Sequence, residues 1–153
     1  MRKFILPLIA SLVLATPALA NDTRVEVRGG AIWSNGTTKA TYGAAAGVDF
    51  DLAPMTFAGV EVSADKIDQA GTKLAYGATG RFGVKVGPFG KLFVAGGYTT
   101  EPCDLCEGSW HAGAGAERSI IGPLYLKAEY RHYFTSNGVP DSNSVVGGVG
   151  MRF

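Results

Sequence analysis

The sequence predicts an all-β protein, an eight-stranded antiparallel up-and-down transmembrane β-barrel. Three observations support this: alternating apolar and polar segments, turn residues between them, and aromatic residues at the segment ends. The final segment, residues 144–153, places Val145, Val149, Met151 and Phe153 on one face of an extended chain, because side chains alternate along a strand. A strand that closes a membrane barrel needs every backbone group paired, and an aromatic side chain suits the lipid interface. The alternative for this segment alone is the last strand of a soluble sandwich.

The first twenty residues have the features of a secretory signal peptide. Arg2 and Lys3 form a basic start, residues 4–15 are an apolar run, and small residues precede a cleavage site between Ala20 and Asn21. The apolar run is too short to span a bilayer as a helix, and a retained anchor is the alternative. We therefore expect a cleaved signal peptide at 1–20 and one barrel domain at 21–153.

The balance of charged residues argues against nucleic-acid binding. Without Arg2 and Lys3, twelve basic residues face thirteen acidic ones, and no basic block is present to follow a phosphate backbone. We therefore expect no nucleic-acid partner. No cofactor motif is present either, and we expect no cofactor and no metal.

Gly, Pro, Asn and Asp residues divide the remaining chain into eight segments of about ten residues or more. Three connections are tight, the first is modest and contains Asn35-Gly36, and the other three are longer and more polar. Short turns at one end and longer loops at the other are typical of outer-membrane barrels, whose strand number is even. The predicted strands are 23–34, 40–51, 55–64, 73–86, 91–100, 109–120, 123–134 and 144–153.

Aromatic residues predict two membrane interfaces, since amphipathic rings favour the depth of the lipid headgroups. One girdle adjoins the first, third, fifth and seventh connections and comprises Trp33, Tyr42, Tyr76, Tyr98, Trp110 and Phe134. A second girdle is expected at the opposite ends, comprising Phe50, Phe57, Phe89, Phe93, Tyr125 and Phe153.

The opposite strand faces carry charged residues, which predicts a polar lumen. An eight-stranded barrel is nearly filled by its side chains, and buried charges persist there only when they are paired. We expect a closed network of ion pairs, with a narrow gated ion path as the alternative. The predicted network comprises Glu26, Arg28, Asp49, Glu61, Arg81, Lys85, Glu117, Lys127, Glu129, Arg131 and Arg152.

Cys103 and Cys106 lie three residues apart in the fifth connection. In an oxidising compartment such a pair predicts a local disulfide. A thioredoxin-like site would need a helix N-terminus, which is not visible in the sequence. A metal site would need further ligands, and His111 is the nearby candidate.

His132, Ser136 and Asp141 are the residue types of an acyl-transfer site. The segment partly resembles the outer-membrane lipid A deacylases, eight-stranded barrels whose motif sets His and Ser two residues apart before Asn. Here the separation is four, and His132 is expected on the lipid-facing side. We therefore expect no catalytic residues and no enzyme.

Residues 24–30, 42–49, 125–131 and 149–153 resemble the first strands and the final hairpin of the opacity-like, OmpA-like family of small outer-membrane barrels. The resemblance implies a monomer in the outer membrane of a Gram-negative bacterium, in contact with lipid and lipopolysaccharide. It also implies delivery by periplasmic chaperones to the barrel-assembly machinery, which recognises the last strand and its aromatic residue, here Phe153.

These observations predict a structural protein of the outer membrane that contributes to envelope integrity and presents loops at the surface. Two other functions remain open. One is a narrow porin-like ion channel. The other is adhesion or recognition through loops 101–108 and 136–143.

Overall fold

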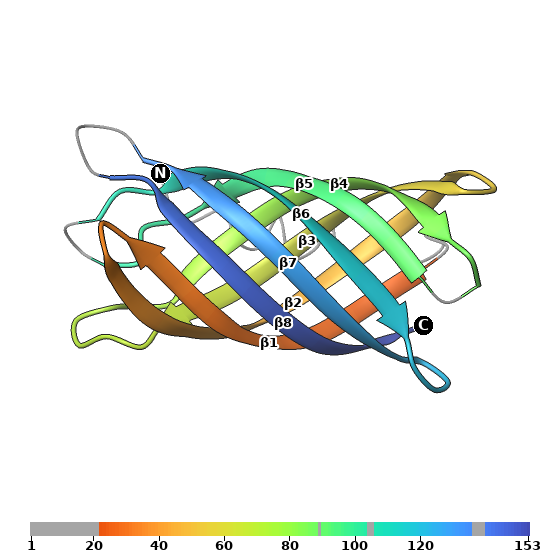
Figure 1. Cartoon of the computed structure of the whole chain (residues 1–153), viewed down its shortest axis with the longest axis horizontal. Helices are drawn as coiled ribbons and strands as arrows, with labels where there is room; N and C mark the ends of the chain where they lie inside the picture. The colour runs from red at the N-terminus through yellow and green to blue at the C-terminus, as the bar shows by residue number, and fades with distance from the viewer. Residues whose placement is uncertain (1–21, 89, 104–105, 136–139) are drawn as a thin grey trace, which may run out of the picture.

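The computed structural model describes residues 22–88, 90–103, 106–135 and 140–153, which form one closed barrel (Figure 1). The predicted signal peptide, with its cleavage site at Ala20 and Asn21, lies outside the described residues. Each strand pairs antiparallel with the next, and β1 pairs with β8, so the predicted eight-stranded transmembrane barrel is confirmed. The strands are β1 (Asp22–Ser34), β2 (Thr37–Ala53), β3 (Thr56–Ile67), β4 (Ala75–Val86), β5 (Gly90–Thr99), β6 (Ser109–Ser119), β7 (Leu124–Phe134) and β8 (Ser142–Arg152).

Among the described residues, no helix has the length and apolar character needed to cross a membrane.

The first connection is tighter than the sequence indicates. Asn35 and Gly36 alone join β1 to β2, with φ angles of 46° and 77°. Two consecutive residues with positive φ are typical of a type I′ hairpin turn, for which Asn-Gly is the favoured pair. Pairing continues up to this turn, where Ser34 lies opposite Thr37, and β2 therefore starts three residues earlier than the predicted strand 40–51.

The barrel has two distinct ends. One end, on the right in Figure 1, is called the termini end here because β1 starts and β8 ends there. Short connections join β2 to β3, β4 to β5 and β6 to β7 at this same end. At the loop end the remaining four connections lie together. Closure extends to the last residue, because Thr23 N–H donates to the Phe153 carbonyl at 3.0 Å and Phe153 N–H donates to the Thr23 carbonyl at 2.8 Å.

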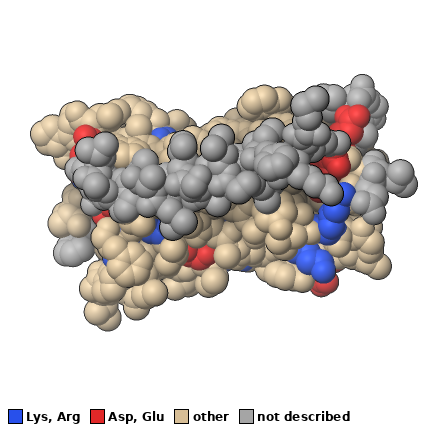
Figure 2. Space-filling view, turned by 180° about the vertical axis from the view of Figure 1, so that it is seen from behind, with Lys and Arg blue, Asp and Glu red and all other residues tan. Residues whose placement is uncertain are grey.

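The outward positions of the strands are small or aliphatic. In β4 the alternation is regular, with Tyr76, Phe82 and Val84 exposed and Thr79 and Arg81 buried. Figure 2 shows a visible outer surface that is mostly uncharged, with the densest group of charges at the loop end, on the right in that view. Such a surface matches the apolar band of a transmembrane barrel.

Only the girdle at the loop end has the predicted orientation. Tyr42, Tyr76, Tyr98, Trp110 and Phe134 are exposed on the outer surface, and the rings of Tyr98 and Trp110 pack edge to face at 5.4 Å between centroids.

The predicted second girdle is wrong for three of its members. Phe57, Phe93 and Tyr125 are 0%, 5% and 0% exposed and point into the lumen. The reason is that side chains two residues apart on a strand share a face. Phe93 is two residues from Lys91 and Tyr125 is two residues from Lys127, and both lysines point inward. Phe153 remains on the outside, and Phe89 lies outside the described residues.

Each inward ring lies against a glycine of the next strand. The cross-strand pairs are Phe57 with Gly83, Phe93 with Gly115 and Tyr125 with Gly150. A Cβ atom on Gly83 would lie 2.8 Å from the Phe57 ring, and one on Gly115 or Gly150 would lie 2.5 Å from the ring opposite. The rings therefore occupy the space into which the Cβ atom of any residue other than glycine would project at these three positions.

This packing predicts different effects for two glycines of β8. We expect Gly150→Ala to lower the free energy of unfolding by about 1–3 kcal/mol, because the added methyl group would lie 2.5 Å from both the Tyr125 ring and the Val25 carbonyl oxygen. Gly147→Ala is the matched control, since its nearest neighbours would be 3.9 Å away. Urea unfolding of the refolded protein in lipid vesicles, followed by Trp fluorescence, measures both. Equal stability of the two variants would contradict the packing described.

Candidate functional site

The lumen is a charged site to which all eight strands contribute. The charged groups lie on inward positions, which alternation along each strand separates from the apolar outer surface. Most of these side chains are nearly inaccessible to solvent. They are Arg24, Glu26 and Arg28 of β1; Asp49 of β2; Glu61 and Asp65 of β3; Arg81 of β4; Lys91 of β5; Glu117 of β6; Lys127, Glu129 and Arg131 of β7; and Arg152 of β8.

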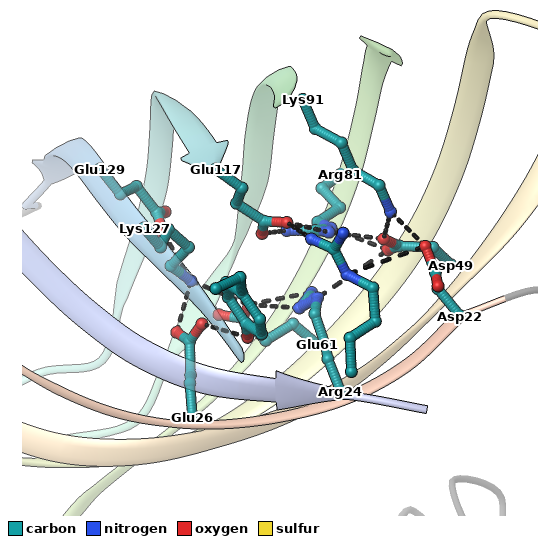
Figure 3. Close-up of polar contacts among 12 residues, drawn as sticks. Asp22, Arg24, Glu26, Asp49, Glu61, Arg81, Lys91, Glu117, Lys127 and Glu129 are labelled. Atoms are coloured by element: carbon teal, nitrogen blue, oxygen red, sulfur yellow. Dashed lines mark hydrogen bonds and ion pairs between the residues drawn. The ribbon is translucent and has the colours of Figure 1, made fainter. Parts of the chain in front are cut away.

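Glu61 is the centre of this network (Figure 3). Its Oε1 lies 2.9 Å from Arg28 Nη1 and 3.0 Å from Arg131 Nη2. Its Oε2 lies 3.0 Å from Arg24 Nη2 and 3.2 Å from Lys127 Nζ. One carboxylate thus contacts four cations, from β1 and β7.

The excess positive charge around Glu61 is balanced by neighbouring acids. Lys127 Nζ also lies 2.5 Å from Glu26 Oε1 and 3.1 Å from Glu129 Oε2, and Arg131 pairs with Glu129 as well. The hydroxyl of Tyr125 donates to Glu26 at 2.9 Å. Charge-assisted hydrogen bonds of this kind are the stronger ones in proteins, and they compensate for removing the charges from water.

A second cluster closes the termini end. Arg81 donates to both oxygens of Asp49, at 2.9 and 2.5 Å, and also pairs with Glu117. Lys91 bridges Asp49 at 3.0 Å and Asp22 at 2.6 Å. Arg152 of the last strand reaches Glu117 at 2.8 Å, so the strands that meet at the barrel seam join the same cluster.

The cations of this cluster also lie over the inward rings. Arg81 Cζ lies 5.2 Å from the Phe57 centroid and 4.9 Å from that of Phe93, while Lys91 Nζ lies 4.7 Å from the Phe57 ring. Arg152 Cζ lies 5.0 Å from the Tyr125 centroid. These distances are within the range of cation–π attraction, which is stronger away from water.

Toward the loop end the lumen is equally well filled. Arg28 holds Asp65 through two parallel hydrogen bonds of 2.8 and 2.5 Å. A cavity between Arg28, Arg131 and Ser144 measures about 20 Å³, which is room for about one water molecule. At this level the lumen leaves very little space beyond its side chains.

The eleven residues predicted to line the lumen mostly meet in these clusters. Lys85 differs, because it lies at the rim of the termini end, 30% exposed, and pairs with Asp51 at 2.5 Å. Sequence reasoning missed Arg24, Lys91, Asp22 and Asp65. Alternation was sufficient to identify Arg24, which is two residues before Glu26, whereas Asp65 lies one residue beyond the predicted strand 55–64 and belongs to the observed β3.

Cys103 and Cys106 form a disulfide in the connection between β5 and β6, with Cα atoms 5.0 Å apart. The same connection contacts the loop between β3 and β4, where Lys73 N–H donates to the Pro102 carbonyl at 2.8 Å. Among the described residues, no group of three or more His, Cys, Asp and Glu side chains is arranged to hold a metal ion.

His132 lies on the outer side of β7 near the loop end. Its Nε2 lies 3.3 Å from Asp141 Oδ2, and its Nδ1 lies 2.8 Å from Asn143 Oδ1, which also accepts a 2.6 Å hydrogen bond from the Tyr130 hydroxyl. The backbone N–H and hydroxyl of Thr135 donate to Asp141 and hold the pKa of its carboxyl below the usual range. Ser136 lies outside the described residues.

No protein-family model and no curated protein matches the sequence. Solved structures do match. The N-terminal barrel domain of Pseudomonas aeruginosa OprF has a TM-score of 0.56 at 13% identity, over 85% of this chain and 97% of that one. Ail, the attachment invasion locus protein of Yersinia pestis, has a TM-score of 0.54 at 11% identity, over 86% and 98%.

The outer-membrane enzyme PagL is also similar, with a TM-score of 0.65 at 15% identity, over 84% of this chain and 98% of that one. This match overturns the expectation that the chain is not an enzyme, because the same barrel architecture supports catalysis in PagL. At these identities the likeness establishes the fold alone, and that fold is the one shared by small outer-membrane barrels.

The contacts of Glu61 lead to a stability prediction. We expect Glu61→Gln to lower the free energy of unfolding by about 3–5 kcal/mol, because it leaves four cations near a neutral group away from water. Lys85→Gln, in the half-exposed pair with Asp51, should cost about 1 kcal/mol or less. Urea midpoints in lipid vesicles measure both, and a small effect of Glu61→Gln would contradict the central role of this carboxylate.

Proposed function

We propose that this chain is an integral outer-membrane protein with a structural role in the envelope, whose lumen is closed by paired charges. The observation that carries the proposal is the filled interior. Thirteen charged side chains from eight strands are linked across the lumen by ion pairs, and Glu61 alone joins β3 to β1 and β7. A conducting pore would need a continuous polar path wide enough for a hydrated ion.

The distribution of apolar residues supports a membrane location. Most large exposed residues of the outer surface are aliphatic, and the aromatic residues near the loop ends of their strands project outward. Short connections face the periplasm in bacterial barrels, so we place the termini end there and the loop end at the cell surface. The proposed signal peptide supports export.

Biogenesis follows from the same proposal. Periplasmic chaperones would deliver the chain to the barrel-assembly machinery, and the exposed ring of Phe153 is available for recognition at the end of the closing strand. The folded protein would be a monomer in contact with phospholipid and lipopolysaccharide.

Deletion of Phe153 tests the assembly step. We expect the deletion to reduce the amount of heat-modifiable protein in outer-membrane fractions several-fold while leaving processing of the signal peptide intact. The reason is that it removes both the exposed ring and the two backbone hydrogen bonds with Thr23. Phe153→Tyr keeps both and serves as the control. Normal levels of the truncated protein would contradict the assigned role. Wild-type protein that fractionates as soluble, with no gel shift on boiling, would refute the membrane location itself.

Planar-bilayer recording tests the closed lumen against the ion-channel alternative. Pure refolded wild-type protein should show no stable openings, because its lumen charges are held in pairs. A variant with both Glu61→Ala and Arg81→Ala, which shortens side chains in both clusters, is the positive comparison and should admit ions if it folds. Reproducible channel events from the wild-type protein would support the porin-like function instead.

A further inference from the structure

A hollow in the outer surface crosses the last three strands, β6, β7 and β8, which lie side by side on the near side in Figure 1. Its volume is about 480 Å³. Its floor consists of small residues in cross-strand register, because Ala116 lies opposite Ala128 and Ala128 lies opposite Gly147. Leu126 and Val149 form its border toward the termini end.

Arg118 lies on this same border and is in register with Leu126. Its side chain is exposed on the outer face, two residues beyond Ala116 and one before the end of β6. It is unusual among the cations of the three strands. Lys127, Arg131 and Arg152 all point inward and make ion pairs, whereas no ion pair or hydrogen bond of the Arg118 side chain is found among the described residues.

An unpaired guanidinium on a lipid-facing surface needs a partner, since a charge exposed to hydrocarbon is costly. A phosphate group is well matched, because the planar guanidinium donates to it through two parallel hydrogen bonds. Arg118 lies near the termini end, which the proposed orientation places in the periplasmic leaflet. Because Arg118 is one residue from the end of β6, we expect the headgroup phosphates of that leaflet at its level.

We propose that the hollow over β6–β8 is a specific phospholipid site, in which Arg118 binds the headgroup phosphate and an acyl chain lies over Ala116, Ala128 and Gly147. This inference rests on the membrane location proposed above. It goes beyond that location by naming one site, one lipid class and the residue that selects it. The apolar floor supplies contact area for the chain, and Arg118 supplies the preference for a phosphate.

Native mass spectrometry measures how much lipid the site retains. The refolded wild-type protein is released from micelles that contain one test lipid. Phosphatidylglycerol and phosphatidylethanolamine should each give a state with one retained lipid. Diacylglycerol with the same chains, which lacks the phosphate, should be retained at about tenfold lower occupancy. Equal retention of all three lipids would overturn the proposal.

Two variants separate the contributions of charge and shape. Arg118→Gln should lower phosphatidylglycerol retention about tenfold and abolish the preference over diacylglycerol. Gly147→Val should lower retention of all three lipids, because the valine side chain would occupy part of the hollow. The change introduces no clash at Cβ, since the nearest atom to a Cβ at position 147 is 3.9 Å away. Lys66→Gln is the matched control, since Lys66 lies in β3 near the loop end, opposite Tyr42 and outside the hollow. It should leave retention unchanged.

The shift of each protein on boiling shows whether it has folded as a barrel. A wild-type protein that shifts but retains no lipid would overturn the lipid site alone, whereas one that does not shift would count against the membrane location. Unchanged retention by Arg118→Gln would also overturn the proposal. A dimer that Gly147→Val disrupts would assign the hollow to a second copy of the chain instead.

Discussion

The rest of the structure depends on the pairing of charges inside a narrow barrel. Removing a carboxylate from water is costly, and Glu61 is stabilised there only because four cations surround it. Those cations come from β1 and β7, while Glu61 comes from β3. The network therefore connects strands that are not neighbours in the sheet, and it fixes the shape of the cross-section in a way that the backbone ladder alone does not.

Glycine, aromatic ring and cation form a repeated unit at the termini end. A glycine leaves space on one strand, a ring from the adjacent strand fills it, and a cation lies over the ring, as in Gly150, Tyr125 and Arg152. The unit occurs across β3–β4, β5–β6 and β7–β8. It places bulky aromatic rings beside the charged clusters, where they limit the access of water to the ion pairs. Because cation–π and ion-pair interactions both strengthen away from water, packing and electrostatics support each other here.

The sequence was sufficient to predict the strand number and most strand ends, because alternation and turn residues are local signals. It was also sufficient to predict many of the charged residues of the lumen, because alternate side chains of a strand point to opposite faces. The second aromatic girdle was predicted wrongly because Phe57, Phe93 and Tyr125 lie near strand ends, as a girdle requires, but on the inward face of their strands. The partners within the network could not be predicted. Whether Arg81 binds Asp49 or Glu129 depends on the stagger between strands that are far apart in the sequence, and only the closed barrel determines it.

Barrels of this architecture differ in function through the side chains that their lumen, loops and outer surface present. OprF, Ail and PagL share the barrel with this chain, yet PagL is described as an enzyme and Ail as an attachment invasion locus protein. The backbone therefore does not select among these activities. In this chain the lumen cations form ion pairs with internal acids, so their charges are balanced within the barrel. Arg118 is exposed and has no protein partner among the described residues, and it stands beside a hollow that small residues keep open. The contrast between a lumen with paired charges and one unpaired outer arginine points to the lipid-facing surface as the place where this barrel makes specific contacts.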